Sequence, residues 1–166
     1  AKTPGLTSVY AANASNAWAV GGEGTIIYFN GTTWAKQTAA SEGATFTSVF
    51  GADATHVWAV GTLDGQGVVN FYDGTTWTDQ TRQMEEKPAV APMNPLSAVW
   101  AANSTSAYAV DTSGNFESLM GVDWLSASGP VKMRAVWAAT PNDVWAVGDV
   151  GVKEYDGALA RRVCRR

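Results

Sequence analysis

NDVWAVG, at residues 142–148, has three close counterparts earlier in the chain. They read NAWAVG at 16–21, HVWAVG at 56–61 and SAYAVD at 106–111. Each is a short run of valine, alanine and an aromatic residue, bounded by polar residues or glycine, which is typical of a short β-strand. The recurrence of one strand indicates that the chain is built from structural repeats.

The residues around this motif repeat as well. Four copies can be aligned, and they span residues 6–38, 46–81, 96–124 and 133–163. Four valines occupy matching places, at intervals of 40, 50 and 37 residues: Val9, Val49, Val99 and Val136. A period of about 40 residues is typical of the four-stranded blade of a β-propeller.

Each copy divides into four strand candidates, which in the first copy are SVYAA, AWAVG, TIIYF and TTWAKQT. Asn30-Gly31, Asp73-Gly74 and Asp156-Gly157 follow the third strand, and such pairs supply the positive φ angles of a two-residue hairpin turn. The sequence therefore predicts a meander of four short antiparallel strands in each copy. The third copy departs from the pattern, with Asp111 for glycine and Met120-Gly121 at the turn.

One meander cannot bury both faces of its sheet, whereas meanders stacked side by side can. We therefore expect an all-β chain that forms a β-propeller or propeller arc of about four blades, each a four-stranded antiparallel meander. The chain is predicted to be a single repeat domain, 1–166, which consists of blade one (about 6–45), blade two (about 46–81), an inter-blade arm (82–95), blade three (about 96–132), blade four (about 133–163) and a basic tail (161–166).

Closure of such a ring is a separate question, because no extra strand at the N-terminus completes the last blade. Three arrangements are compatible with the sequence. In the first, the four blades form a small ring. In the second, two chains pair into an eight-bladed ring, which two-fold symmetry permits. The third arrangement is an arc whose end faces contact other proteins, since soluble monomers rarely expose large apolar patches.

Composition excludes several classes of protein. Hydrophobic residues make up 46% of the chain, and no apolar run approaches the roughly 20 residues of a membrane-spanning helix. The net charge of −4 combines an acidic body with four C-terminal arginines, so nucleic acid is not an expected partner. The opening AKTPG fits a mature end left by leader removal, and equally a trimmed chain. We expect an exported protein.

No catalytic, cofactor or metal site is expected. A hydrolytic triad would need His56, the one histidine, which lies in a polar turn where the other copies have Asn16, Ser106 and Asp143. Cys164, the one cysteine, has no base nearby in the sequence. Glu85 and Glu86 are adjacent acids in a proline-rich loop, and the calcium pattern of alternating acidic residues is missing.

The strongest alternative to a scaffold role is carbohydrate binding by tryptophan side chains. One matched set could stack on sugar rings, in a carbohydrate-binding propeller: Trp34, Trp77 and Trp124. Packing between blades requires the same recurrence, so we favour a role in the core.

These repeats resemble a bacterial β-propeller repeat that is written approximately SVWGxxxxDVWAVGxxGTIxHYDGTTW. Such repeats occur in exported and cell-surface proteins, and they look like distant relatives of sialidase-type and photosystem-assembly-factor-type propellers. The resemblance extends over residues 6–163. It implies a fold and no activity, because the repeated residues are those that pack blades, and the sialidase Asp-box has no match in frame.

The expected function is that of a non-catalytic interaction or scaffold subunit, an exported accessory component of a larger assembly. Its partners are other protein subunits or a second copy, and an anionic membrane surface or acidic partner for the basic tail. The candidate contact residues are Arg161, Arg162, Arg165, Arg166, Glu85, Glu86, Pro88 and Pro92. A carbohydrate-binding propeller is the alternative. A sialidase-like hydrolase is a third candidate function. It would need clustered acids and three arginines that converge at one face of the ring, and the candidates are Arg82, Arg134 and the tail arginines.

Overall fold

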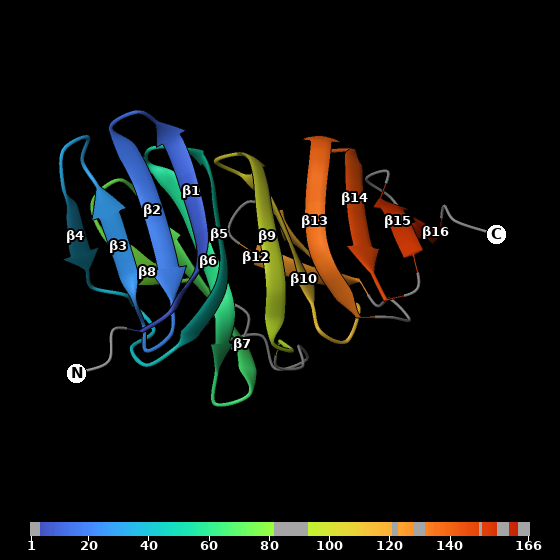
Figure 1. The fold of residues 1–166 in the computed structure, drawn as a ribbon. Helices are drawn as coiled ribbons and strands as arrows, with labels where there is room; N and C mark the ends of the chain where they lie inside the picture. Colours follow the sequence, from blue (N-terminus) through green and yellow to red (C-terminus); the bar gives the residue numbers. More distant parts are fainter. Residues whose placement is uncertain are drawn as a thin grey trace.

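A computed structural model of the chain describes residues 4–81, 93–120, 123–127, 132–149, 151–155 and 160–162. These residues form four antiparallel sheets of four strands each, and the order of strands in every sheet follows the order of the chain (Figure 1). The predicted all-β class and the four-stranded meander are therefore confirmed.

Each sheet is one blade, and its strands have these bounds. Blade one contains β1 (Leu6–Asn13), β2 (Asn16–Gly21), β3 (Ile26–Phe29) and β4 (Trp34–Gln37). Blade two contains β5 (Thr45–Asp53), β6 (His56–Leu63), β7 (Gln66–Tyr72) and β8 (Trp77–Asp79). Blade three contains β9 (Leu96–Asn103), β10 (Ser106–Asp111), β11 (Phe116–Met120) and β12 (Asp123–Ala127). Blade four contains β13 (Met133–Thr140), β14 (Asp143–Gly148), β15 (Gly151–Tyr155) and β16 (Ala160–Arg162).

The repeated motif forms the second strand of every blade, at β2, β6, β10 and β14. Its aromatic residue lies directly opposite an aromatic residue of the first strand, in the pairs Tyr10–Trp18, Phe50–Trp58, Trp100–Tyr108 and Trp137–Trp145. Cross-strand aromatic pairs stabilise antiparallel strands, so each motif fixes the register of its own first hairpin.

The first hairpin of blades one to three turns over two residues, and a side chain caps the turn. A side-chain oxygen accepts a hydrogen bond from the backbone N–H two residues later: Asn13 from Ser15 at 2.9 Å, Asp53 from Thr55 at 2.7 Å and Asn103 from Thr105 at 3.0 Å. Asn and Asp favour turns by this local bond, which explains the polar residues between the first two strands.

The predicted two-residue turn after the third strand is wrong. The chain crosses from β3 to β4 over residues 30–33, and the Asn30 side chain accepts hydrogen bonds from the backbone N–H groups two and three residues later, both at 3.0 Å. Only Gly31 of the pair has a positive φ, +93°, whereas a two-residue turn of this type requires both residues to have one. Asp73-Gly74 makes the same longer loop, and Asp156-Gly157 lies outside the described residues.

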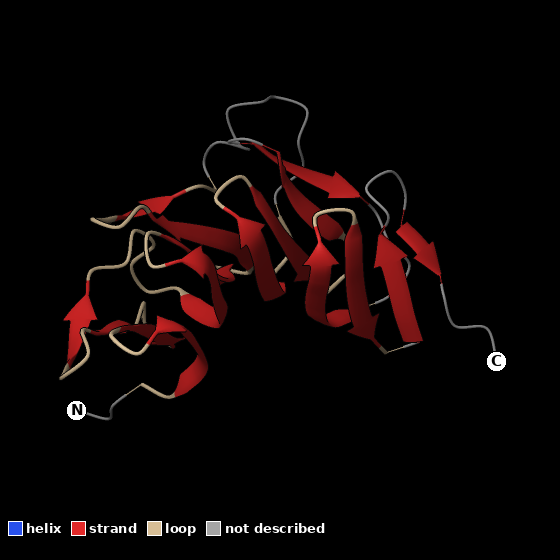
Figure 2. Cartoon of the chain, turned by 90° about the horizontal axis from the view of Figure 1, so that it is seen from above, coloured by secondary structure: helices blue, strands red, loops and turns tan. Residues whose placement is uncertain are grey.

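The four blades stand side by side along an arc. Their first strands, β1, β5, β9 and β13, are neighbours, and the later strands extend outward from them. Blade one and blade four lie at opposite ends of the arc (Figure 2). The chain alone is therefore an open arc and does not form the small closed ring.

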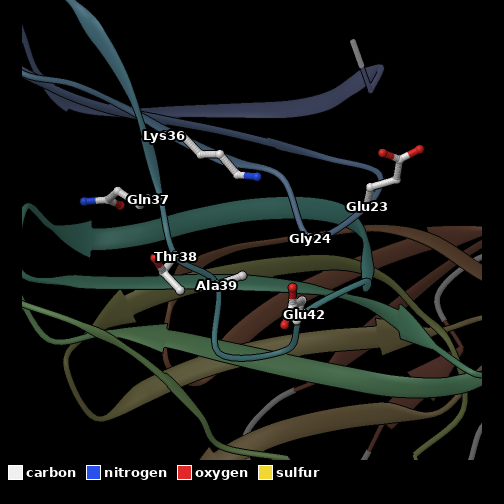
Figure 3. Close-up of a pocket in the computed structure, with 7 residues that line it drawn as sticks. All are labelled: Glu23, Gly24, Lys36, Gln37, Thr38, Ala39 and Glu42. Atoms are coloured by element: carbon white, nitrogen blue, oxygen red, sulfur yellow. The ribbon is translucent and has the colours of Figure 1, made fainter. Parts of the chain in front are cut away.

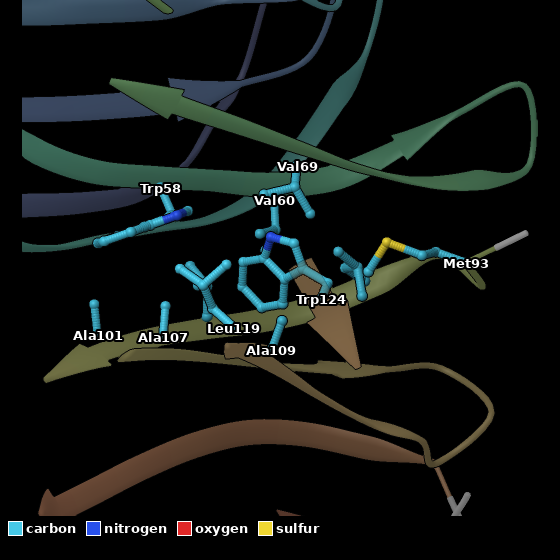
Figure 4. Packing of buried hydrophobic residues seen from close by; sticks show 11 residues of the cluster. Trp58, Val60, Val69, Met93, Ala101, Ala107, Ala109, Leu119 and Trp124 are labelled. Atoms are coloured by element: carbon cyan, nitrogen blue, oxygen red, sulfur yellow. The ribbon is translucent and has the colours of Figure 1, made fainter. Parts of the chain in front are cut away.

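Hydrophobic side chains fill the space between neighbouring blades in three clusters. Trp18, Val20 and Ile26 of blade one pack on Phe46 and Val49 of blade two. In the cluster between blades two and three, shown in Figure 4, Trp58 and Val60 meet small alanines and the large Leu119 and Trp124 of blade three. Tyr108 and Val110 of blade three meet Met133 and Val144 of blade four. Each inner blade is thus buried on both faces.

The last residue of the second strand differs in blade three, which has an aspartate where the other blades have glycine. Gly21, Gly61 and Gly148 occupy one repeat position, where a Cβ on Gly61 would lie 2.1 Å from the Thr45 carbonyl oxygen. Asp111 takes this place in blade three. Its buried carboxylate accepts hydrogen bonds from Asn94 and from the turn at 113–115, at 2.7 to 2.8 Å. The departure noted in the sequence is therefore a capped turn.

Candidate interaction surfaces

Blade one presents an open apolar surface at one end of the arc, which we name the first-blade face. Its residues are Leu6, Val9, Ile27 and Trp34, and they line a hollow of about 690 Å³ together with Thr7, Ser8 and Ala19. Val9 is 67% exposed, whereas its counterparts Val49 and Val99 are 2% and 4% exposed. The counterparts are covered by the preceding blade, so the first-blade face has the shape of a blade contact without a blade on it.

Blade four presents a second open apolar surface at the other end of the arc, which we name the fourth-blade face. It corresponds to the face that the following blade covers in the other blades. Its residues are Ala135, Trp137, Trp145 and Val147. Trp137 is 58% and Val147 is 44% exposed, whereas valines at the matching position of the other blades, Val20, Val60 and Val110, are fully buried. The following blade covers those valines, so the fourth-blade face also lacks a neighbour.

Threonine hydroxyl groups join the blades near the start of their first strands. Thr7 Oγ1 lies 3.1 Å from the carbonyl oxygen of Val20 in its own blade and 2.7 Å from that of Phe46 in the next. Thr47 repeats this arrangement between blades two and three, at 3.1 and 2.8 Å. Blade four has Arg134 at this place, and Arg134 instead pairs with Asp149 on its own blade at 2.5 Å.

Serine hydroxyl groups make a second set of bonds between blades. Ser8 Oγ accepts a hydrogen bond from the backbone N–H of Val49 at 3.1 Å, and Ser48 Oγ accepts one from that of Val99 at 3.3 Å. The matching residue of blade four is Ala135. The fourth-blade face is therefore apolar where the corresponding faces of blades one and two carry a hydroxyl.

The three tryptophans of the sugar-binding alternative differ in how far they are exposed to solvent. Trp34 is 47% exposed, whereas Trp77 and Trp124 are 8% and 3% exposed between blades. Trp77 Nε1 donates to Gln37 of blade one at 2.8 Å, and Trp124 Nε1 donates to Gln80 of blade two at 3.4 Å. Trp34 is the member of this set whose ring is open to a ligand.

A small polar pocket of about 280 Å³ lies where blade one joins blade two (Figure 3). The β2–β3 loop contributes Glu23, β4 contributes Lys36 and Gln37, and the connection to β5 contributes Glu42. The sequence did not point to this pocket, because its charged residues come from three separate turns and strands and follow no repeat pattern. The amide oxygen of Gln37 is already occupied by Trp77.

A second hollow, of about 510 Å³, lies among blades two, three and four at the start of their first strands, and its floor includes the apolar Pro95, Leu96 and Met133. Its lining combines the hydroxyls of Thr47, Thr62 and Ser97 with Lys132 and Arg134. The Thr62 hydroxyl is buried without a hydrogen-bond partner, whereas Thr47 is used between the blades. The hollow therefore combines an apolar floor with a few polar groups, and Asp149 already pairs with one of its two cations, Arg134.

Glu117 on β11 is a buried acid between blades two and three. One carboxylate oxygen accepts a hydrogen bond from Ser126 Oγ at 2.9 Å, and the other is buried without a partner. Burial raises the pKa of Glu117 to about 7, the hydrogen bond from Ser126 opposes this shift, and the charge of Asp111 adds to it. No pattern in the sequence pointed to this residue.

The remaining predicted residues are placed as follows. Arg161 and Arg162 lie on β16, which is the last strand of the blade four sheet and forms its outer edge among the described residues. Strand edges with charged residues resist unwanted pairing. The other six predicted contact residues lie outside the described residues: Arg165, Arg166, Glu85, Glu86, Pro88 and Pro92.

The local geometry around His56 does not match a hydrolytic relay. Its Nδ1 lies 3.0 Å from the Asp53 carboxylate and 3.1 Å from Thr55 Oγ1. A relay needs the acid and the nucleophile at different ring nitrogens, whereas here both partners meet the same one. Within the described ranges, no three His, Cys, Asp or Glu side chains gather closely enough to hold a metal ion. The same part of the chain has no helix long and apolar enough to cross a membrane.

No protein-family model and no curated protein matches the sequence. Solved structures do resemble it. One, described as Ycf48 bound to D1 peptide, is 18% identical with a TM-score of 0.69, over 95% of this chain and 53% of that chain. Another, the computationally designed Ika4 protein, is 15% identical with a TM-score of 0.69, over 94% and 93% of the two chains.

A third similar structure contains the WD40 repeats of RRP9, which are 9% identical with a TM-score of 0.71, over 94% of this chain and 49% of that chain. These likenesses agree with the resemblance to propellers of the photosystem-assembly-factor type, at the level of the fold. The chain has a propeller fold, and it spans about half the length of the Ycf48 and WD40 chains that it resembles.

Proposed function

We propose that this chain is a non-catalytic protein-interaction scaffold, an exported accessory component that stabilises a larger assembly. The observation that carries the proposal is the pair of open apolar surfaces, the first-blade face and the fourth-blade face. In the interior of the arc, surfaces with the same repeat positions are buried against protein. Apolar surface of this kind favours association with another protein.

The chemistry of the two faces supports a protein partner. The hydroxyls of the first-blade face are already engaged, since Thr7 bonds carbonyl oxygens and Ser8 bonds the next blade. The faces therefore offer mainly apolar and aromatic contact area, which is enriched at the centre of protein interfaces. The solved Ycf48 structure is described with a bound D1 peptide, which fits a propeller that contacts other proteins.

The proposal is tested by affinity capture from the native host with the tagged chain and a double variant, Val9→Asp with Trp137→Asp. We expect stoichiometric capture of a protein, either a different one or the untagged chain, that the double variant fails to retain. Gln66→Asp, at the exposed first residue of β7 in blade two, is the control and should capture normally. Capture that is identical for all three chains, or no capture, would contradict the proposal.

Carbohydrate binding is the second candidate, and the exposed ring of Trp34 favours it. Sugar rings stack on open aromatic faces, and they also need polar groups beside the ring. A glycan array that gives a signal with the wild-type chain and none with Trp34→Ala would support this candidate, and an array without signal would contradict it.

A further inference from the structure

We propose that the partner of the two open faces is a second copy of this chain, bound head to tail so that two arcs close into one eight-bladed ring. The fourth-blade face of each copy covers the first-blade face of the other. This inference names a partner for the scaffold proposed above and therefore rests on it.

The first argument is that the two faces are complementary halves of a contact already made three times within the chain. At every internal junction, the face of one blade that carries the cross-strand aromatic pair packs on the valine-bearing first strand of the next blade. The fourth-blade face is a surface of the first kind, with Trp137 and Trp145. The first-blade face is of the second kind, with Val9.

The second argument is curvature. The four blades superpose on 49% of a WD40 chain with a TM-score of 0.71, and on 53% of a Ycf48 chain with a TM-score of 0.69. WD40 repeats form closed rings of blades, so this arc bends as about half of such a ring. The missing half has the size of one more copy.

The third argument concerns which contacts the second copy would restore. Within the chain, Tyr10 and Phe50 on successive first strands have ring centroids 5.0 Å apart, and Phe50 and Trp100 are 6.1 Å apart. Trp137 occupies the same position on β13. It would lie beside Tyr10 of the second copy, in the way that Tyr10 lies beside Phe50 and Phe50 beside Trp100.

The new junction is expected to be weaker than the two internal junctions that follow blades one and two. Blade four has Arg134 and Ala135 where blades one and two have the bonding threonine and serine. The junction therefore relies on apolar and aromatic contact, and no covalent connection holds it. We expect pairing that reverses on dilution.

Mixing two disabled chains tests the pairing. Val9→Asp disables the first-blade face, and Trp137→Asp disables the fourth-blade face; both residues are more than half exposed, so the monomer should fold. Light scattering on a sizing column should give the wild-type chain a mass that rises with concentration from 17.5 kDa to twice that value. Each variant alone should stay at 17.5 kDa. An equal mixture should again form pairs, because one intact junction remains.

Three results would overturn the proposal. One is a wild-type chain that is monomeric at every concentration, and another is pairing of either variant alone, which would mean that like faces pair with like. Growth beyond two chains is the third, since a heterologous contact that does not close makes filaments. A monomeric wild-type chain whose faces still capture a different protein would leave the scaffold function intact and remove only the second copy.

Restoring one lost hydroxyl should strengthen the pairing. Ala135→Ser places an oxygen where Ser8 and Ser48 accept the N–H of Val49 and Val99 at 3.1 and 3.3 Å, opposite Val9 of the second copy. We expect the dissociation constant to fall about five-fold for each of the two junctions, because a net hydrogen bond contributes about 1 kcal/mol. Ala127→Ser, at an exposed position of blade three, is the matched control. Unchanged pairing by Ala135→Ser would contradict the proposed register.

Discussion

Replacing Trp58 with alanine is expected to lower the free energy of unfolding by about 3–5 kcal/mol, the usual cost of deleting a buried tryptophan side chain. Trp58 is fully buried in the cluster between blades two and three, its ring lies 5.0 Å from that of Phe71, and its Nε1 donates to Gln80 at 3.2 Å. Because domains are stabilised by only about 5–15 kcal/mol, this loss removes a large part of the total. Urea denaturation followed by circular dichroism would measure it.

The repeats supply a matched control for this prediction. Trp145 occupies the position of Trp58 in blade four, where no following blade covers it. Trp145→Ala removes the same atoms and the hydrogen bond to Asp143, yet at low protein concentration it should cost only about 1–2 kcal/mol, since less apolar area leaves a protein environment. Equal losses for both variants would contradict the role that we assign to the neighbouring blade.

Glu117→Gln is expected to stabilise the protein at pH 8 by up to about 3 kcal/mol and to leave stability at pH 4.5 nearly unchanged. The pKa of Glu117 is raised from 4.5 to about 7, chiefly by burial. Between these two values the folded chain keeps a proton that the unfolded chain has released, so the stability of the wild type falls as pH rises. Above pH 7 both states are ionised, and the full cost of burying the charge remains.

Denaturation of the wild type and Glu117→Gln at several values between pH 4.5 and 8 would show the curves diverging with increasing pH. Asp73→Asn is a control of opposite sign. Backbone N–H groups of Thr76 and Thr75 hold the pKa of Asp73 below its ordinary value, so the contribution of this acid is lost as pH falls. Parallel curves for the wild type and Glu117→Gln would mean that Glu117 ionises as freely in the folded chain as in the unfolded one.

Much of the fold could be predicted from the sequence because packing between blades repeats. The VWAVG motif identified β2, β6, β10 and β14, since a short strand with one aromatic and two small residues suits only the inner part of a blade. The turn after the third strand could not be predicted from Asn30-Gly31 alone. The same dipeptide serves a two-residue turn and the longer loop found here, and the hydrogen bonds of the Asn30 side chain decide between them.

The candidate surfaces could not be predicted from any single repeat, because the exposure of a residue depends on whether a neighbouring blade covers it. Trp34 and Trp77 occupy the same place in nearly identical sequences, and only the presence of a preceding blade makes one buried and the other exposed. Glu117 was unpredictable for a related reason. In the sequence it belongs to a weak strand pattern, NFESLM, and its burial follows from the blade that packs against it.

Each sheet is complete within one stretch of chain, since every blade consists of four successive strands and none is exchanged with a neighbour. Each blade is therefore encoded by one continuous segment of the gene. Duplication or deletion of about 40 codons, one repeat period, adds or removes a whole blade without interrupting the strand pairing inside any other blade. Lineages that inherit such a segment can change the number of blades in integer steps.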